Sequence, residues 1–73
     1  MDENVIKGQW KQIRGHAKEW WGKLTDDDLD VINGKLDQLI GKLQEKYGYT
    51  KEQAMRQIDD RVAELRHTTP MSH

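Results

Sequence analysis

The sequence contains no cysteine, no phenylalanine and only one proline among its 73 residues. Without cysteine, the chain can form neither a disulfide framework nor a thiolate metal site. The single serine, Ser72, is the residue before the last, and the three histidines are scattered, so no nucleophile is paired with a base. We therefore predict that the protein is not an enzyme and requires no cofactor.

Long apolar runs are also missing. No segment approaches the roughly 18 apolar residues that a membrane span needs. The first ten residues, MDENVIKGQW, lack the basic start and apolar stretch of a signal peptide. The formal net charge of −1 provides no overall attraction to nucleic acid or acidic lipid. These features predict a cytoplasmic protein without a transmembrane segment.

Charge is abundant: 34% of the residues are charged and 34% are hydrophobic. A chain this short holds one small core at most and lies near the lower size limit for folding without staples. We expect one domain over residues 1–66. The remaining residues, 67–73, include the proline and show no periodicity, so we expect a disordered tail there.

Apolar residues recur at helical spacing in three stretches. The first predicts one long helix over about residues 3–22, the second a helix ending near Gly48, and the third a helix ending near Arg66. The apolar positions are Ile6, Trp10, Ile13, Ala17, Trp20, Trp21 and Leu24, then Ile32, Leu36, Leu39, Ile40, Leu43 and Tyr47, then Ala54, Met55, Ile58, Val62 and Leu65.

Capping residues divide these stretches. Thr25, followed by three aspartates, is typical of a helix start, and Thr50 with Gln53 predicts a capping box. The pair Asn33-Gly34 is either a break between two helices or a weak point within one. The aspartates at 26, 27, 28 and 30 lack the glycine turn and closing glutamate of a calcium loop, so helix capping explains them better than a metal site.

The two halves of the chain repeat one pattern at an offset of 26 residues. Gly8, Gln12, Gly15, Glu19 and Gly22 correspond to Gly34, Gln38, Gly41, Glu45 and Gly48. Each half then consists of a glycine-marked helix, a capped turn and a shorter helix. We predict an all-α, four-helix domain in which two αα-hairpins pack across one another.

The glycines allow several interpretations. Gly22 and Gly48 are predicted as C-terminal helix stops. Gly8, Gly15, Gly34 and Gly41 fall opposite the apolar stripes, although a glycine inside a helix costs about 1 kcal/mol relative to alanine. They are either a tolerated weakness on a solvated face, a smooth groove for a second protein chain, or a device that makes helicity respond to water activity or crowding.

Two features suggest an interaction surface. Four basic residues at i, i+4, i+7 and i+11 form a strip that could follow phosphates or an anionic membrane, or could be solvated or paired with nearby acidic residues. The tryptophans are predicted to supply the core, but two adjacent indoles point about 100° apart, which leaves open whether both are fully covered. An exposed indole edge could then dock a partner protein. The predicted surface consists of Lys7, Lys11, Arg14, Lys18, Trp20 and Trp21.

The segments GQWKQIRGHAKEWWGKLTDDDL and GKLDQLIGKLQEKYGY closely resemble the CsbD-like family of small bacterial stress-response proteins. The resemblance runs from about Asn4 to Ile58. It implies a cytoplasmic all-helical domain that is induced in general stress or stationary phase, with no established activity or cofactor, and it supplies no site residues.

We therefore predict a monomeric, non-catalytic stress-response protein that acts as a hydrophilic protectant or an interaction module. A protein partner is left open. The alternative is a module that binds nucleic acid or an anionic surface through the basic strip of the first helix.

Overall fold

Five helices account for most of the chain in the computed structural model, which describes residues 3–67. They are α1 (Glu3–Gly8), α2 (Trp10–Trp20), α3 (Asp26–Ile32), α4 (Leu36–Tyr47) and α5 (Lys51–His67). Within residues 3–67 there is no strand, so the predicted all-α class is confirmed. Most of the predicted tail, residues 68–73, lies outside the described residues, and His67 still belongs to α5.

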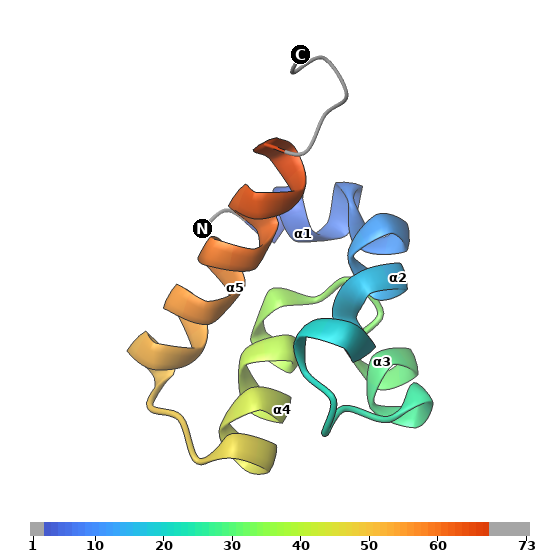
Figure 1. The fold of residues 1–73 in the computed structure, drawn as a ribbon. Helices are drawn as coiled ribbons and strands as arrows, with labels where there is room; N and C mark the ends of the chain where they lie inside the picture. Colours follow the sequence, from blue (N-terminus) through green and yellow to red (C-terminus); the bar gives the residue numbers. More distant parts are fainter. Residues whose placement is uncertain (1–2, 68–73) are drawn as a thin grey trace.

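Helix α4 occupies the centre of the fold. It packs against α1, α3 and α5, and Figure 1 shows α5 running beside it while α2 and α3 lie on its other side. The buried residues come from all five helices and from the loop between α2 and α3, and they form one cluster. This core consists of Ile6, Ile13, Ala17, Trp21, Leu24, Leu29, Ile32, Leu39, Ile40, Leu43, Ala54, Ile58 and Val62.

The expected continuous helix over residues 3–22 is instead two helices, which raises the number of helices from four to five. The break is at Gln9, whose φ of −112° and ψ of 15° are not helical, and α1 lies across the direction of α2 (Figure 1). Helical hydrogen bonds still flank the bend, from the Gln9 N–H to the Val5 carbonyl and from the Ile13 N–H to the Gln9 carbonyl. Gly8 precedes the bend, and glycine is a common site of helix kinks.

The Asn33-Gly34 pair separates α3 from α4. Asn33 has a left-handed conformation with φ 42° and ψ 44°, and Gly34 follows with φ 84°. Gly34 is buried: a Cβ atom placed there would lie 3.4 Å from the Trp10 Cβ and 3.5 Å from the Lys7 Cα. The turn between α3 and α4 therefore rests on the bend between α1 and α2. A Cβ would make only ordinary contacts there, and it is the positive φ that favours glycine.

The prediction that four glycines lie exposed, opposite the apolar stripes, is accordingly wrong at Gly34. The other three, Gly8, Gly15 and Gly41, are exposed, and a Cβ at any of them would meet nothing within 4 Å. The error at Gly34 arose because helical periodicity was extended through a turn, where it has no meaning.

The predicted caps are present, with one exception. Thr25 accepts from the Asp28 N–H while the Asp28 side chain accepts from the Thr25 N–H, which is a complete capping box at the start of α3. Thr50 and Gln53 form the same pair of bonds at the start of α5, and Gly48 ends α4 with φ 70°. The exception is Gly22, which is not the helix stop, because α2 ends at Trp20 and Trp21 forms its C-cap.

Candidate interaction surface

The basic strip divides into a paired half and an unpaired half. On α2, the Arg14 Nη1 lies 2.8 Å from the Asp30 Oδ1, and the Lys18 Nζ lies 3.0 Å from the Asp26 Oδ1. Both acidic partners belong to α3, so these bonds connect α2 to α3. Because the side chains are largely exposed, each pair contributes about 1 kcal/mol or less. Their positive charges are nevertheless locally neutralised.

Lys7 and Lys11 make up the unpaired half. Both are exposed, and neither forms an ion pair with any residue from 3 to 65. Lys11 also lines a hollow of about 320 Å³ at the bend, together with Gly8, Gln9 and Gln12. Within the strip, the positive charge available to an external anion therefore lies near the junction of α1 and α2.

The two adjacent tryptophans have different environments. Trp21 is buried in the core, and its indole Nε1 has no hydrogen-bond partner among the described residues. Trp20 is half-buried and meets Trp21 in a T-shaped arrangement, with ring centroids 5.5 Å apart and planes at 78°. Trp20 is thus the indole that remains accessible at the surface.

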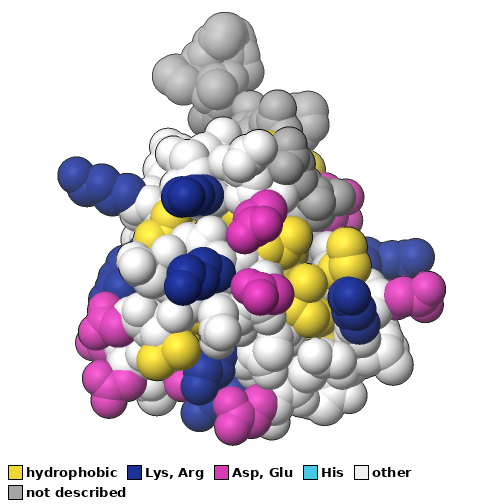
Figure 2. Space-filling view, turned by 180° about the vertical axis from the view of Figure 1, so that it is seen from behind, with side chains coloured by type: hydrophobic (Ala, Val, Ile, Leu, Met, Phe, Trp, Pro, Cys, Tyr) yellow, Lys and Arg dark blue, Asp and Glu magenta, His cyan; other side chains and the backbone are white. Residues whose placement is uncertain are grey.

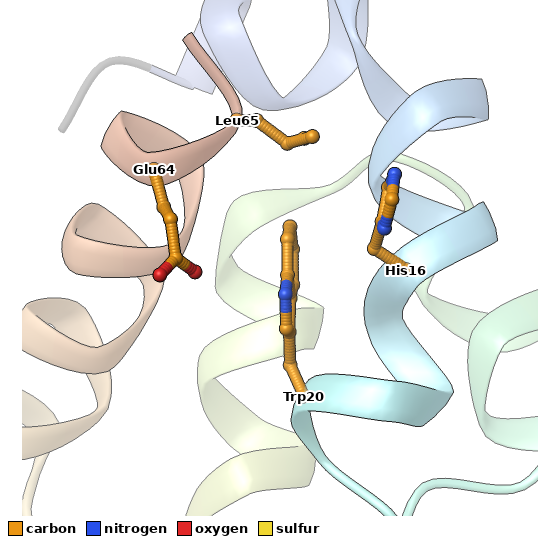
Figure 3. A pocket seen from close by; sticks show the side chains of 4 residues that line it. All are labelled: His16, Trp20, Glu64 and Leu65. Atoms are coloured by element: carbon orange, nitrogen blue, oxygen red, sulfur yellow. The ribbon is translucent and has the colours of Figure 1, made fainter. Parts of the chain in front are cut away.

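Trp20 lines a hollow of about 310 Å³ between α2 and α5. His16 stacks on Trp20 with a centroid separation of 5.4 Å and an interplanar angle of 16°. Figure 3 shows Glu64 and Leu65 approaching from α5, with the Trp20 ring standing between His16 and Glu64. Sequence reasoning identified Trp20 but missed the three other residues, because nothing local indicates that α5 lies opposite this part of α2.

A buried charge cluster joins α3 to α4 and was also missed. Asp28 is buried, and its carboxylate lies 3.3 Å from both the Lys42 Nζ and the Lys46 Nζ. The Thr25 N–H donates to the Asp28 Oδ2 at 2.9 Å. This backbone hydrogen bond is the main cause that lowers the pKa of Asp28 to about 2, against the opposing effect of burial, and the two lysines add to it.

The cluster is structural rather than a ligand site, because its carboxylate oxygens are already occupied. The hydrogen bond to Asp28 is in turn the main cause that raises the pKa of Lys42. The i, i+4 spacing of Lys42 and Lys46 was the one signal that could have suggested two lysines acting on the same partner. Across the described residues, no group of three or more histidine, aspartate or glutamate side chains is placed to hold a metal ion.

The remaining surface carries charges of both signs. On the face shown in Figure 2, basic and acidic side chains are interspersed, and several hydrophobic side chains are visible between them. Among the described residues, Val31 is the one large hydrophobic residue that is mostly exposed, at 54%. No described helix has the length and apolar character required to span a bilayer.

The family model described as CsbD-like matches residues 4–56, from the start of α1 to the first part of α5. The chain belongs to the CsbD-like family. The match includes all six residues of the predicted interaction surface but ends before Glu64 and Leu65.

Relatives of this CsbD-like protein are similar over most of their length. The chain is 55% identical over 60 residues to the UPF0337 protein YjbJ of Escherichia coli K12, covering 82% of this chain and 87% of the relative. It is 59% identical over 58 residues to the UPF0337 protein ECA0631 of Pectobacterium atrosepticum, covering 80% and 84%. It is also 59% identical over 60 residues to the UPF0337 protein RPA4217 of Rhodopseudomonas palustris, covering 82% and 91%. No solved structure matches the chain.

Proposed function

We propose that this CsbD-like protein is a non-catalytic, cytoplasmic stress-response protein that acts as a hydrophilic protectant. The observation that carries the proposal is the open space around the helix glycines. At Gly15 and Gly41, both inside helices, a side chain would meet nothing within 4 Å. Glycine at such positions loses helix stability and gains no contact within the monomer in return.

The size of this loss supports a functional explanation. Each glycine costs a helix interior about 1 kcal/mol relative to alanine, whereas a folded chain of this size has a net stability of roughly 4–11 kcal/mol. Two such positions therefore take a substantial share of the available stability. Weakened helices bearing many charges would keep backbone and side chains available to water and to other macromolecules when water becomes scarce.

The test is a double variant, Gly15→Ala with Gly41→Ala, compared with Gly22→Ala as control. Gly22 lies in the α2–α3 loop, where an added Cβ would make only an ordinary contact of 3.9 Å with the Lys18 carbonyl. The double variant should be more stable to urea by about 2 kcal/mol and should preserve less activity of a labile enzyme through drying. Equal protection by the more stable variant would contradict the proposal.

The unpaired lysines favour a second candidate, binding to nucleic acid or another anionic surface. With Arg14 and Lys18 already paired to α3, Lys7 and Lys11 remain for phosphate contacts. Two contacts give weak binding with a shallow salt dependence. The predicted interaction surface would then work through its N-terminal half.

A mobility-shift assay with duplex DNA at about 50 mM salt tests this candidate. Lys7→Glu with Lys11→Glu should remove any retardation. The matched control is Lys51→Glu with Arg56→Glu, which makes the same change in net charge at exposed residues of α5 and should leave the retardation of the DNA intact. The strip would be ruled out as a binding site if the wild-type protein did not retard the DNA, or if both variants lost the retardation equally.

A further inference from the structure

The hollow between α2 and α5 combines a held aromatic ring with a carboxylate. Trp20 is fixed on one side by the stacked His16 and at an angle by Trp21. Such contacts hold the indole in place before any ligand arrives, so binding would require little further ordering of this side chain. The volume of about 310 Å³ is at the lower end of the range for small-molecule sites.

Glu64 supplies the negative charge of the hollow. In Figure 3 its carboxylate lies on the side of the Trp20 ring opposite His16, and Leu65 lies near one edge of the ring. The Glu64 side chain is 58% exposed, and its Oε1 has a loose contact of 3.5 Å with the Arg61 Nη1. The carboxylate is therefore only weakly engaged by the protein itself.

The other charged groups nearby on residues 3–65 do not reverse this negative character. Glu19 lies 3.7 Å from the His16 Nδ1 and adds a second carboxylate on the α2 side. Lys18 belongs to α2 as well, but it is bound to Asp26 of α3. Arg61 is the competing cation that contacts Glu64.

We propose that this hollow binds a small organic cation through a trimethylammonium group placed against Trp20 and near Glu64. The indole quadrupole attracts a cation within about 6 Å of the ring. Methyl groups also suit the apolar wall formed by Leu65, and a bulky ammonium ion loses hydration more easily than a metal ion does. A metal ion fits poorly, because the described residues that line the hollow include a single carboxylate. This site does not depend on the proposed role as a protectant.

Choline is the probe, with 3,3-dimethylbutan-1-ol as a neutral molecule of nearly the same shape. The indole N–H and backbone amide signals of the ¹⁵N-labelled full chain are followed by NMR while choline chloride replaces sodium chloride at constant ionic strength. We expect saturable shifts at the Trp20 indole and at the amides of Glu64 and Leu65, with a Kd on the order of 10 mM. The neutral alcohol should produce no saturable shift.

Two variants of α5 test whether the negative charge of Glu64 contributes to choline binding. Glu64→Gln should weaken choline binding about threefold. Arg61→Gln, which alters a charge on the same helix, should bind at least as tightly as the wild type, because it releases the Glu64 carboxylate. The proposal is overturned if choline produces no saturable shift, if the alcohol binds equally well, or if Glu64→Gln binds choline as tightly as the wild type.

Discussion

At the scale of single residues, the six glycines do not have one common role. Gly34 and Gly48 have positive φ angles, so a side chain at either position would be strained. Gly34 is in addition packed against Lys7 and Trp10. Gly15 and Gly41 lie within helices with open space around them, so a side chain there would be accommodated without any shift.

This difference predicts opposite effects of the same substitution. Gly34→Ala should lower the free energy of unfolding by about 1–3 kcal/mol, because alanine is strained at the positive φ of this position. Gly41→Ala should raise it by up to about 1 kcal/mol. Urea denaturation followed by circular dichroism measures both values. A stabilising effect at Gly34 would mean that the turn between α3 and α4 does not have the conformation described here.

At the scale of secondary-structure elements, local signals place the helix starts and longer-range bonds fix how the helices meet. The Tyr47 Oη accepts a hydrogen bond from the Lys23 N–H at 3.1 Å, and the Lys23 Nζ lies 5.2 Å from the centre of the Tyr47 ring. This ties the α2–α3 loop to the end of α4. Asp28 performs the equivalent task between α3 and α4, and it also completes the cap of α3.

The Asp28 cluster predicts a specific loss of stability in acid. The pKa of Asp28 is lowered in the folded state from 3.8 to about 2. As the pH falls, Asp28 therefore takes up its proton in the unfolded chain before it does so in the folded protein. The stability contributed by Asp28 is therefore complete above about pH 4 and declines down to about pH 2, by about 2 kcal/mol in total. Urea titrations at a series of pH values measure this decline.

The matched comparison is between Asp28→Asn and Asp59→Asn. Asparagine at position 28 still offers an oxygen to the Thr25 N–H but has no charge for the lysines, so about 2 kcal/mol of the decline should disappear. Asp59 is exposed on α5 and has no ion pair within residues 3–65, so its variant should retain the wild-type decline. An Asp28→Asn profile parallel to that of the wild type would show that the cluster does not control acid stability.

At the scale of the whole molecule, the five helices share one core. Their buried residues form a single cluster, and the radius of gyration of 11.9 Å is close to the value of about 11 Å expected for a folded chain of this length. The four helices α1 to α4 have 12 residues or fewer, which is too short to be stable alone in water. Cooperative unfolding is the consequence.

We therefore predict that tryptophan fluorescence and far-ultraviolet circular dichroism report the same urea midpoint. Ile13→Ala, which leaves a cavity under α2, should lower the free energy of unfolding by about 2–4 kcal/mol and move both midpoints together. If the fluorescence transition moved while the helical signal stayed in place, α2 would be unfolding independently of the remaining helices.

Much of this fold was predictable because its signals are local. A helical stripe depends on residues three and four apart, and a capping box depends on residues three apart, so Thr50 with Gln53 could be recognised without any knowledge of the fold. The all-α class and most of the buried positions followed from such patterns. The basic strip and the accessible indole were predicted from the same periodicity.

Only the tertiary structure decided which of these residues meet. The bend at Gln9, the burial of Gly34 against Trp10 and the neutralisation of Arg14 by Asp30 all depend on the angles at which helices cross. The approach of Glu64 to Trp20 depends on them as well. Periodicity along one helix contains no information about these angles, because they are set by side-chain packing between residues far apart in the chain. The sequence by itself thus determined the helices and their inward faces, and packing determined the surface available for binding.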